Sequence, residues 1–144
     1  MHVGGERLTS IERGLVVFVG IGADDRPEDG ERLAAKIAGL RIFEDERGKM
    51  SLSVADAGGA ILAVPQFTLY GDVRGGRRPD FAKAAPPDRG QRLYDAFCGA
   101  LRGRALRVEA GRFGAHMVVS ADGDGPVTIV VSTDGWAEGD VGRG

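Results

Sequence analysis

The sequence has little of what several classes of protein require. It contains a single cysteine, Cys98, so it cannot form an internal disulfide, and this suits a reducing, cytoplasmic setting. Its longest apolar run, residues 15–21, is far too short to span a bilayer. Residues 1–10 contain no apolar segment of the kind that signal peptides carry. We therefore expect a cytoplasmic protein with no membrane partner.

An excess of basic residues is also absent. The formal net charge of −2 is not that of a protein that holds nucleic acid along a long track, and we expect no DNA partner. The balance still permits a local basic patch that contacts the end of an RNA. The acidic residues 44–46 have no histidine beside them, which favours a solvated turn over a metal site. We expect no metal and no cofactor.

What is present indicates one globular domain. The chain has 144 residues, of which 42% are hydrophobic, and this is enough for a proper core. Apolar patterns predict strands over residues 15–21, 60–65, 116–121 and 127–132. Two helices are predicted, one capped by Asp25 with an apolar face through Leu40, the other from Pro87 to Gly103. A hairpin turn is possible at residues 3–6.

Residues 60–72, AILAVPQFTLYGD, are the most informative stretch. An apolar run predicts a buried strand, and polar and aromatic residues follow at its end. Gln66 and Thr68 are two positions apart, so their side chains leave one face of an extended strand. Two interpretations remain open: a small polar site on a rigid support, or polar groups that cap the following turn.

Residues 73–80, VRGGRRPD, form a second candidate. Arg74, Arg77 and Arg78 lie around two glycines, and guanidinium groups on a flexible backbone suit contact with phosphate. An ordinary exposed, charged loop is the alternative.

Three stretches together resemble the D-aminoacyl-tRNA deacylase family: PQFTLYGD at residues 65–72, GRFGAHM at 111–117 and DGPVT at 124–128. Residues 40–50 and 77–87 match the family as well, in its order and near its spacing. The resemblance implies a single-domain α+β fold, with mixed and antiparallel sheets in a barrel-like core and two main helices. Residues 1–132 form this domain, and residues 133–144 form a flexible or loosely docked tail.

The implied activity is hydrolysis of the ester bond of D-aminoacyl-tRNA, and of glycyl-tRNA, by a homodimer that binds the acceptor end. Gln66 orients the substrate, and the N–H groups of Phe67 and Thr68 stabilise the oxyanion. Thr68 as a nucleophile has no evident activating base, and His116 is an outward strand residue. The resemblance implies that Phe113, Gly114, Ala115, Met117 and Thr128 bind the substrate. The arginines of residues 73–80 would then contact phosphates of the tRNA.

The resemblance also implies a chiral gate. A cis bond between Gly125 and Pro126 reaches into the partner's active site and excludes L-aminoacyl groups, which is specificity by exclusion. Three departures from the family pattern stand out: Pro65 replaces a serine, Gly123 replaces an asparagine, and the family begins about one strand earlier. They motivate an alternative, a catalytically weak or silent relative that binds aminoacyl-tRNA ends or a small ligand without turnover. An unrelated esterase would need a nucleophile triad that the sequence does not offer.

Overall fold

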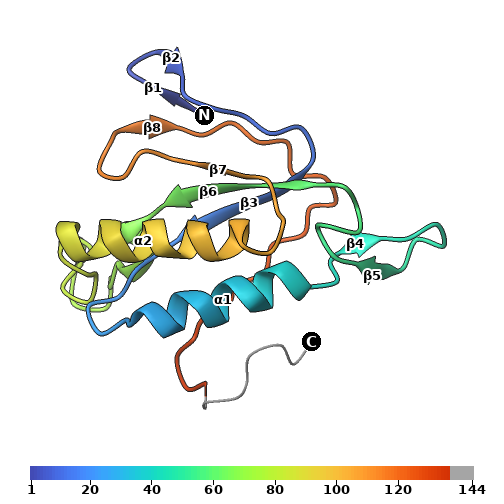
Figure 1. Ribbon diagram of the computed structural model, residues 1–144. Coiled ribbons are helices and arrows are strands. Elements are labelled where there is room, and N and C mark those ends of the chain that lie inside the picture. Colours follow the sequence, from blue (N-terminus) through green and yellow to red (C-terminus); the bar gives the residue numbers. More distant parts are fainter. Residues whose placement is uncertain (137–144) are drawn as a thin grey trace.

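A computed structural model describes residues 1–136 of the chain (Figure 1). A parallel sheet runs through the centre, in the order β3-β6-β7, with β3 spanning Gly14–Val19, β6 Ala60–Pro65 and β7 Val108–Ala110. β6 is the middle strand, and its residues 60–64 are buried. This explains its unbroken apolar run, because a strand covered on both faces does not alternate with polar residues.

Two helices pack against each other and against one face of this sheet. The helix α1 spans Pro27–Gly39 and α2 spans Pro87–Arg102. Each begins at a proline, which lacks the N–H that a helix start leaves unbonded anyway. Both predicted helices are therefore confirmed. The predicted capping residue of α1 is wrong: Arg26 occupies that position, and its N–H donates to Oδ2 of Asp29 at 2.9 Å. Asp25 instead accepts the N–H of Gly22 at 2.7 Å.

The short strands form two antiparallel sheets. β1 (His2–Val3) lies between β2 (Glu6–Arg7) and β8 (Met117–Val118), and β4 (Phe43–Glu44) pairs with β5 (Met50–Leu52). Gly4 and Gly5 have φ angles of 58° and 82°, so glycine is suited to this turn, and the predicted hairpin is present. The chain is thus a single α+β domain with two main helices, as the sequence predicted.

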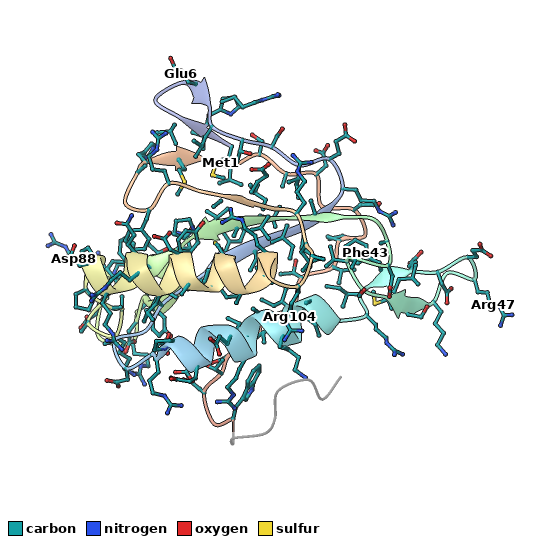
Figure 2. All side chains as sticks on the ribbon, in the orientation of Figure 1. Met1, Glu6, Phe43, Arg47, Asp88 and Arg104 are labelled. Carbon is teal, nitrogen blue, oxygen red and sulfur yellow. The ribbon has the colours of Figure 1, made fainter. Side chains whose placement is uncertain are left out.

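Side chains of β6 alternate between two apolar clusters, which gives the domain its layers. Ile61 and Ala63 belong to the larger cluster, which α1 and α2 cover. Leu62 and Val64 pack on the other face, against Met1 near the β1–β2 hairpin. Figure 2 shows side chains filling the space between these layers. Among the described residues, no helix combines the length and the apolar character needed to cross a membrane.

The strand prediction fails in the C-terminal third. β8 covers only residues 117–118 of the strand expected over 116–121, and residues 127–132 form no strand. A strand needs a hydrogen-bonded neighbour, and no described segment pairs with residues 127–132. β7, which lies among arginines, was not predicted.

The last described residues reach back to α1. Trp136 is half-buried, and its ring lies under two cations of α1: the centroid is 5.5 Å from Cζ of Arg32 and 6.0 Å from Nζ of Lys36. Most of the predicted tail, residues 137–144, lies outside the described residues.

Candidate functional site

The end of β6 presents the polar pair that the sequence singled out. The N–H of Gln66 donates to the carbonyl of Val19 at 2.8 Å, which holds the residue against the neighbouring strand. The chain then turns into a short 3-10 helix, η1, spanning Phe67–Tyr70. The Nε2 of Gln66 donates to Oγ1 of Thr68. The two side chains therefore lie together, on a support fixed by the central sheet.

Two backbone donors next to this pair point to the chemistry available here. In residues 1–136, neither the N–H of Phe67 nor that of Thr68 has a hydrogen-bond acceptor. Two adjacent N–H groups without an acceptor can both donate to an oxygen that develops negative charge. The Phe67 side chain is 57% exposed, and its ring packs edge-on to Phe81 with centroids 5.1 Å apart.

The Thr68 hydroxyl has no general base. Its only hydrogen bond in the described structure is the one it accepts from Gln66, and His116 lies on an exposed position just before β8. A nucleophilic hydroxyl requires a base within hydrogen-bonding reach. The described residues also contain no group of three or more histidine, cysteine or acidic side chains that could hold a metal ion.

Residues 111–117 lie beside the end of β6. The N–H of Gly111 donates to the carbonyl of Ala63 at 2.8 Å. A side chain at Gly111 would lie 2.9 Å from Cδ of Pro65 and 3.0 Å from Sδ of Met117, so only glycine fits between them. Three of the predicted binding residues are half-buried: Phe113, Ala115 and Met117. Gly114 is exposed and has a φ of 77°. The structure thus brings this predicted segment next to Gln66.

The other predicted residues of the substrate site do not join it within one chain. The peptide bond between Gly125 and Pro126 is cis, and Gly125 has a φ of 121°, which favours glycine. Gly123, Gly125, Pro126 and Thr128 are all exposed. Figure 1 shows that the chain after β8 first runs toward the end of the sheet opposite the tip of β6.

The arginine-rich loop is only partly free for a ligand. Arg74 is bound to Asp72 through three side-chain contacts of 2.6 to 3.1 Å. These hydrogen bonds lower the pKa of Asp72 to about 2. Arg77 and Arg78 are exposed and make no hydrogen bond or ion pair within the described residues. An antiparallel bridge between Asp72 and Asp80 closes the loop.

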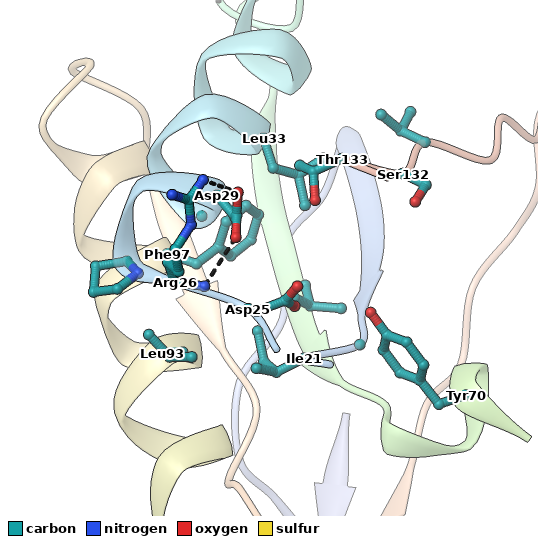
Figure 3. Close-up of a pocket in the computed structure, with 15 residues that line it drawn as sticks. Ile21, Asp25, Arg26, Asp29, Leu33, Tyr70, Leu93, Phe97, Ser132 and Thr133 are labelled. Carbon is teal, nitrogen blue, oxygen red and sulfur yellow. Dashed lines mark hydrogen bonds and ion pairs between the residues drawn. The ribbon is translucent and has the colours of Figure 1, made fainter. Parts of the chain in front are cut away.

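A separate cavity of about 70 Å³ lies at the start of α1, beside Tyr70 of η1 (Figure 3). Asp25 and Tyr70 line it together with Ser132 and Thr133, a grouping that the sequence did not suggest. Burial raises the pKa of Asp25, with the charges of Asp29 and Asp134 adding to the effect and the Gly22 N–H opposing it. Burial also raises the pKa of Tyr70. Because ligand pockets usually span about 300–1,000 Å³, this cavity is too small for a nucleoside.

Comparison with known proteins gives consistent matches along almost the whole chain. The sequence profile of the family described as D-Tyr-tRNA(Tyr) deacylase matches residues 1–132. A D-aminoacyl-tRNA deacylase of Thermotoga petrophila is 59% identical over 124 residues, which cover 86% of this chain and 83% of that protein. One of Thermus aquaticus is 55% identical over 131 residues, which cover 91% of this chain and 86% of that protein.

Two solved structures share the fold of this chain. The structure titled c-Myc DNA Unwinding Element Binding Protein is 43% identical, with a TM-score of 0.84, and the match covers 91% of this chain and 90% of that one. A probable eukaryotic D-amino acid tRNA deacylase has a TM-score of 0.65 at 23% identity, over 74% of this chain and 77% of that one, and so supports the fold alone.

Proposed function

The chain belongs to the D-Tyr-tRNA(Tyr) deacylase family and is a hydrolase acting on ester bonds, and we propose that it removes D-amino acids from tRNA. Water adds to the ester carbonyl that joins the D-amino acid to the 3′-terminal ribose, and the products are the free D-amino acid and tRNA. Glycyl-tRNA, which has no side chain to exclude, is a second substrate. The observation that carries the proposal is the pair of unpaired N–H groups at Phe67 and Thr68, beside Gln66.

The mechanism relies on backbone electrostatics. The attack of water places negative charge on the carbonyl oxygen, and the N–H groups of Phe67 and Thr68 donate to it. Gln66 orients the ester, and its hydrogen bond to Thr68 holds its side chain for this role. The 2′-hydroxyl of the terminal ribose helps to activate water. The lack of a base near Thr68 among residues 1–136 supports this scheme over a covalent intermediate.

The terminal adenosine binds along residues 111–117. Phe113, Gly114, Ala115 and Met117 line this side of the site, and Thr128 contributes from the segment after the gate. The contact of Gly111 with Pro65 supports the assignment, because it sets these residues next to Gln66. Arg77 and Arg78 contact phosphates of the acceptor end, whereas Arg74 joins them only by leaving Asp72.

Chirality is read by a second copy of the chain. Gly125 and Pro126 of one protomer form the gate of its partner's site, where an L side chain would collide with the backbone. Their exposure and the course of the chain after β8 in Figure 1 support a role outside their own subunit. Val127, Ile129 and Val130 follow the gate and are also exposed, with Val130 at 93%, so a homodimer would bury apolar surface here.

A silent relative that binds aminoacyl-tRNA ends without turnover is the second candidate, and Pro65 at the site is the observation that favours it. The test is deacylation of matched D- and L-aminoacyl-tRNA by the purified chain, with glycyl-tRNA as the achiral control. The proposal expects rapid loss of the D and glycyl esters with the L ester spared. Binding of aminoacyl-tRNA without hydrolysis, by a folded dimer, would instead establish the second candidate.

A further inference from the structure

Tyr94 of α2 is a buried polar residue that the proposed mechanism leaves unused. Its side chain is 1% exposed. Its hydroxyl donates to the carbonyl of Ala63 at 2.8 Å and lies 3.4 Å from the carbonyl of Gly111. These carbonyls belong to the two segments that build the site, since Ala63 lies on β6, which leads into Gln66, and Gly111 precedes Phe113.

The hydrogen bonds of β6 follow a strict alternation, as in any parallel strand between two neighbours. On the β3 side, the N–H of Ala60 donates to the carbonyl of the residue before β3 at 2.9 Å, and the N–H of Gln66 donates to the carbonyl of Val19 at 2.8 Å. The N–H of Ile61 donates toward β7, at 2.9 Å to Arg107, and Gly111 returns a bond to Ala63 at 2.8 Å. Continuing this register, the N–H of residue 65 would donate to the carbonyl of Gly111.

Residue 65 is a proline and has no N–H to donate. The loss falls on the β7 side alone, because the β3 side is served by Gln66. The carbonyl of Gly111, which is half-buried, therefore lacks its ladder partner. A backbone carbonyl shielded from water costs free energy when it has no donor. The hydroxyl of Tyr94 is the donor next to it. A hydroxyl has one proton, so Ala63 receives the primary bond and Gly111 the longer arm of a shared one.

We propose that Tyr94 is a positioning residue whose hydroxyl takes the place of the ladder hydrogen bond that Pro65 cannot make. Through this contact it sets the distance between the catalytic segment, residues 66–68, and the binding segment, residues 111–117. The ring of Tyr94 adds to the effect, because it packs on Phe113 with centroids 6.1 Å apart. The effect of Tyr94 on the reaction rests on the proposed deacylase function. Its structural part, in which the Tyr94 hydroxyl replaces the missing hydrogen bond, does not rest on that function.

A double-mutant cycle tests the first half without any assay of activity. It compares the native chain, Tyr94→Phe, Pro65→Ala and the double variant by chemical denaturation. Tyr94→Phe in the native background should raise the unfolding equilibrium constant about threefold to tenfold, which is the usual worth of one hydrogen bond. In the Pro65→Ala background, the restored N–H group of residue 65 donates to the carbonyl of Gly111. The effect of Tyr94→Phe on the unfolding equilibrium constant should therefore be at least about threefold smaller in that background.

The second half is read from kinetics of D-aminoacyl-tRNA hydrolysis. Tyr94→Phe should lower kcat about threefold to tenfold with little change in KM, because it misplaces the ester relative to the N–H donors while the tRNA contacts remain. Pro65→Ala should recover most of this loss in the double variant. Phe97→Leu is the matched control: it also disturbs a buried α2 side chain in the same cluster, and it should lower stability without lowering kcat at temperatures where it is folded.

The outcomes separate the two claims. If Tyr94→Phe changed the unfolding equilibrium constant equally in both backgrounds, the claim that the Tyr94 hydroxyl replaces the missing hydrogen bond would be overturned. Coupling in stability with an unchanged kcat would overturn the positioning role and leave Tyr94 as a structural residue. A native chain that is folded but hydrolyses no ester would refute the proposed function and with it the positioning role, whereas coupling in the denaturation cycle would still establish the bond itself.

Discussion

The Nε2 of Gln66 donates a hydrogen bond to Oγ1 of Thr68, across a single residue at the start of η1. The bond occupies one lone pair of the hydroxyl and fixes the glutamine side chain beside the N–H groups of Phe67 and Thr68. The threonine thus supports its neighbour, which is a different task from attacking a substrate.

Thr68→Ala should lower kcat for D-aminoacyl-tRNA by less than about a hundredfold, because it removes a support for Gln66 and keeps both backbone donors. Loss of a covalent nucleophile typically costs on the order of a millionfold. Single-turnover kinetics with quenching and mass spectrometry of the protein provide the measurement. An acyl group trapped on Thr68 of the native chain would contradict the backbone mechanism, and Thr68→Ser serves as the control that keeps the hydroxyl.

Two variants that are each inactive should complement one another if the gate acts on the partner's site. Gln66→Ala damages the orientation of the substrate, and Gly125→Val places a Cβ 3.2 Å from the backbone N of Val127 at an unfavourable φ. An equal mixture exchanged to equilibrium should regain about a quarter of native activity, since half of the dimers are mixed and each has one intact site. A gate that served its own chain would give no recovery.

Arg77→Ala and Arg78→Ala should each weaken binding of deacylated tRNA and reduce the slope of log affinity against log salt by about 0.7–0.9. Asp72→Asn should strengthen binding, because it releases Arg74 from its present partner. Fluorescence anisotropy at several salt concentrations measures both effects. Arg47→Ala is the matched control, because it removes one exposed arginine at the β4–β5 turn. This turn lies at the opposite end of the domain from Asp88, at the start of α2, into which the segment after Arg78 leads (Figure 2). An equal change in slope for Arg47→Ala would contradict the assignment.

Asp25→Asn should raise stability at neutral pH and have no such effect in acid. Because burial raises the pKa of Asp25, the folded state binds this proton more tightly than the unfolded chain, whose carboxyl keeps a value near 3.8. Ionised Asp25 therefore costs stability above its folded pKa, and the cost disappears as pH falls below the unfolded value. Denaturation of both proteins between about pH 7 and pH 3 provides the measurement. A variant less stable than the native chain at pH 7 would contradict it.

Local patterns in the sequence were enough for the elements that carry the site. The apolar run of residues 60–65 is β6. The extended strand end expected at Gln66 and Thr68 is wrong, because β6 stops at Pro65 and Thr68 lies in η1, and it is this turn that brings the two side chains together. Prolines and apolar spacing likewise predicted α1 and α2, because these features act within a few residues of each other.

What the sequence could not supply depends on register and on neighbours distant in the chain. The relation of Tyr94 to Gly111 exists only because β6 and β7 pair in one particular register, and β7 is too short to predict. Residues 127–132 have a strand-like apolar pattern, but a strand also requires a neighbour that the pattern does not reveal. The cavity at Asp25 is closed by Ser132 and Thr133, more than a hundred residues away along the chain.

The seating of Trp136 on the α1 cations has an optical consequence. It is the only tryptophan in the chain, so light absorbed beyond the range of tyrosine reports on this one place. Cations held over an indole alter the wavelength and yield of its emission, and lifting the ring into water would change both. The protein thus carries an intrinsic fluorescent probe on the segment that follows Ser132 and Thr133. Without any added label, the emission wavelength of Trp136 reports whether substrate binding at the start of η1 changes the environment of α1.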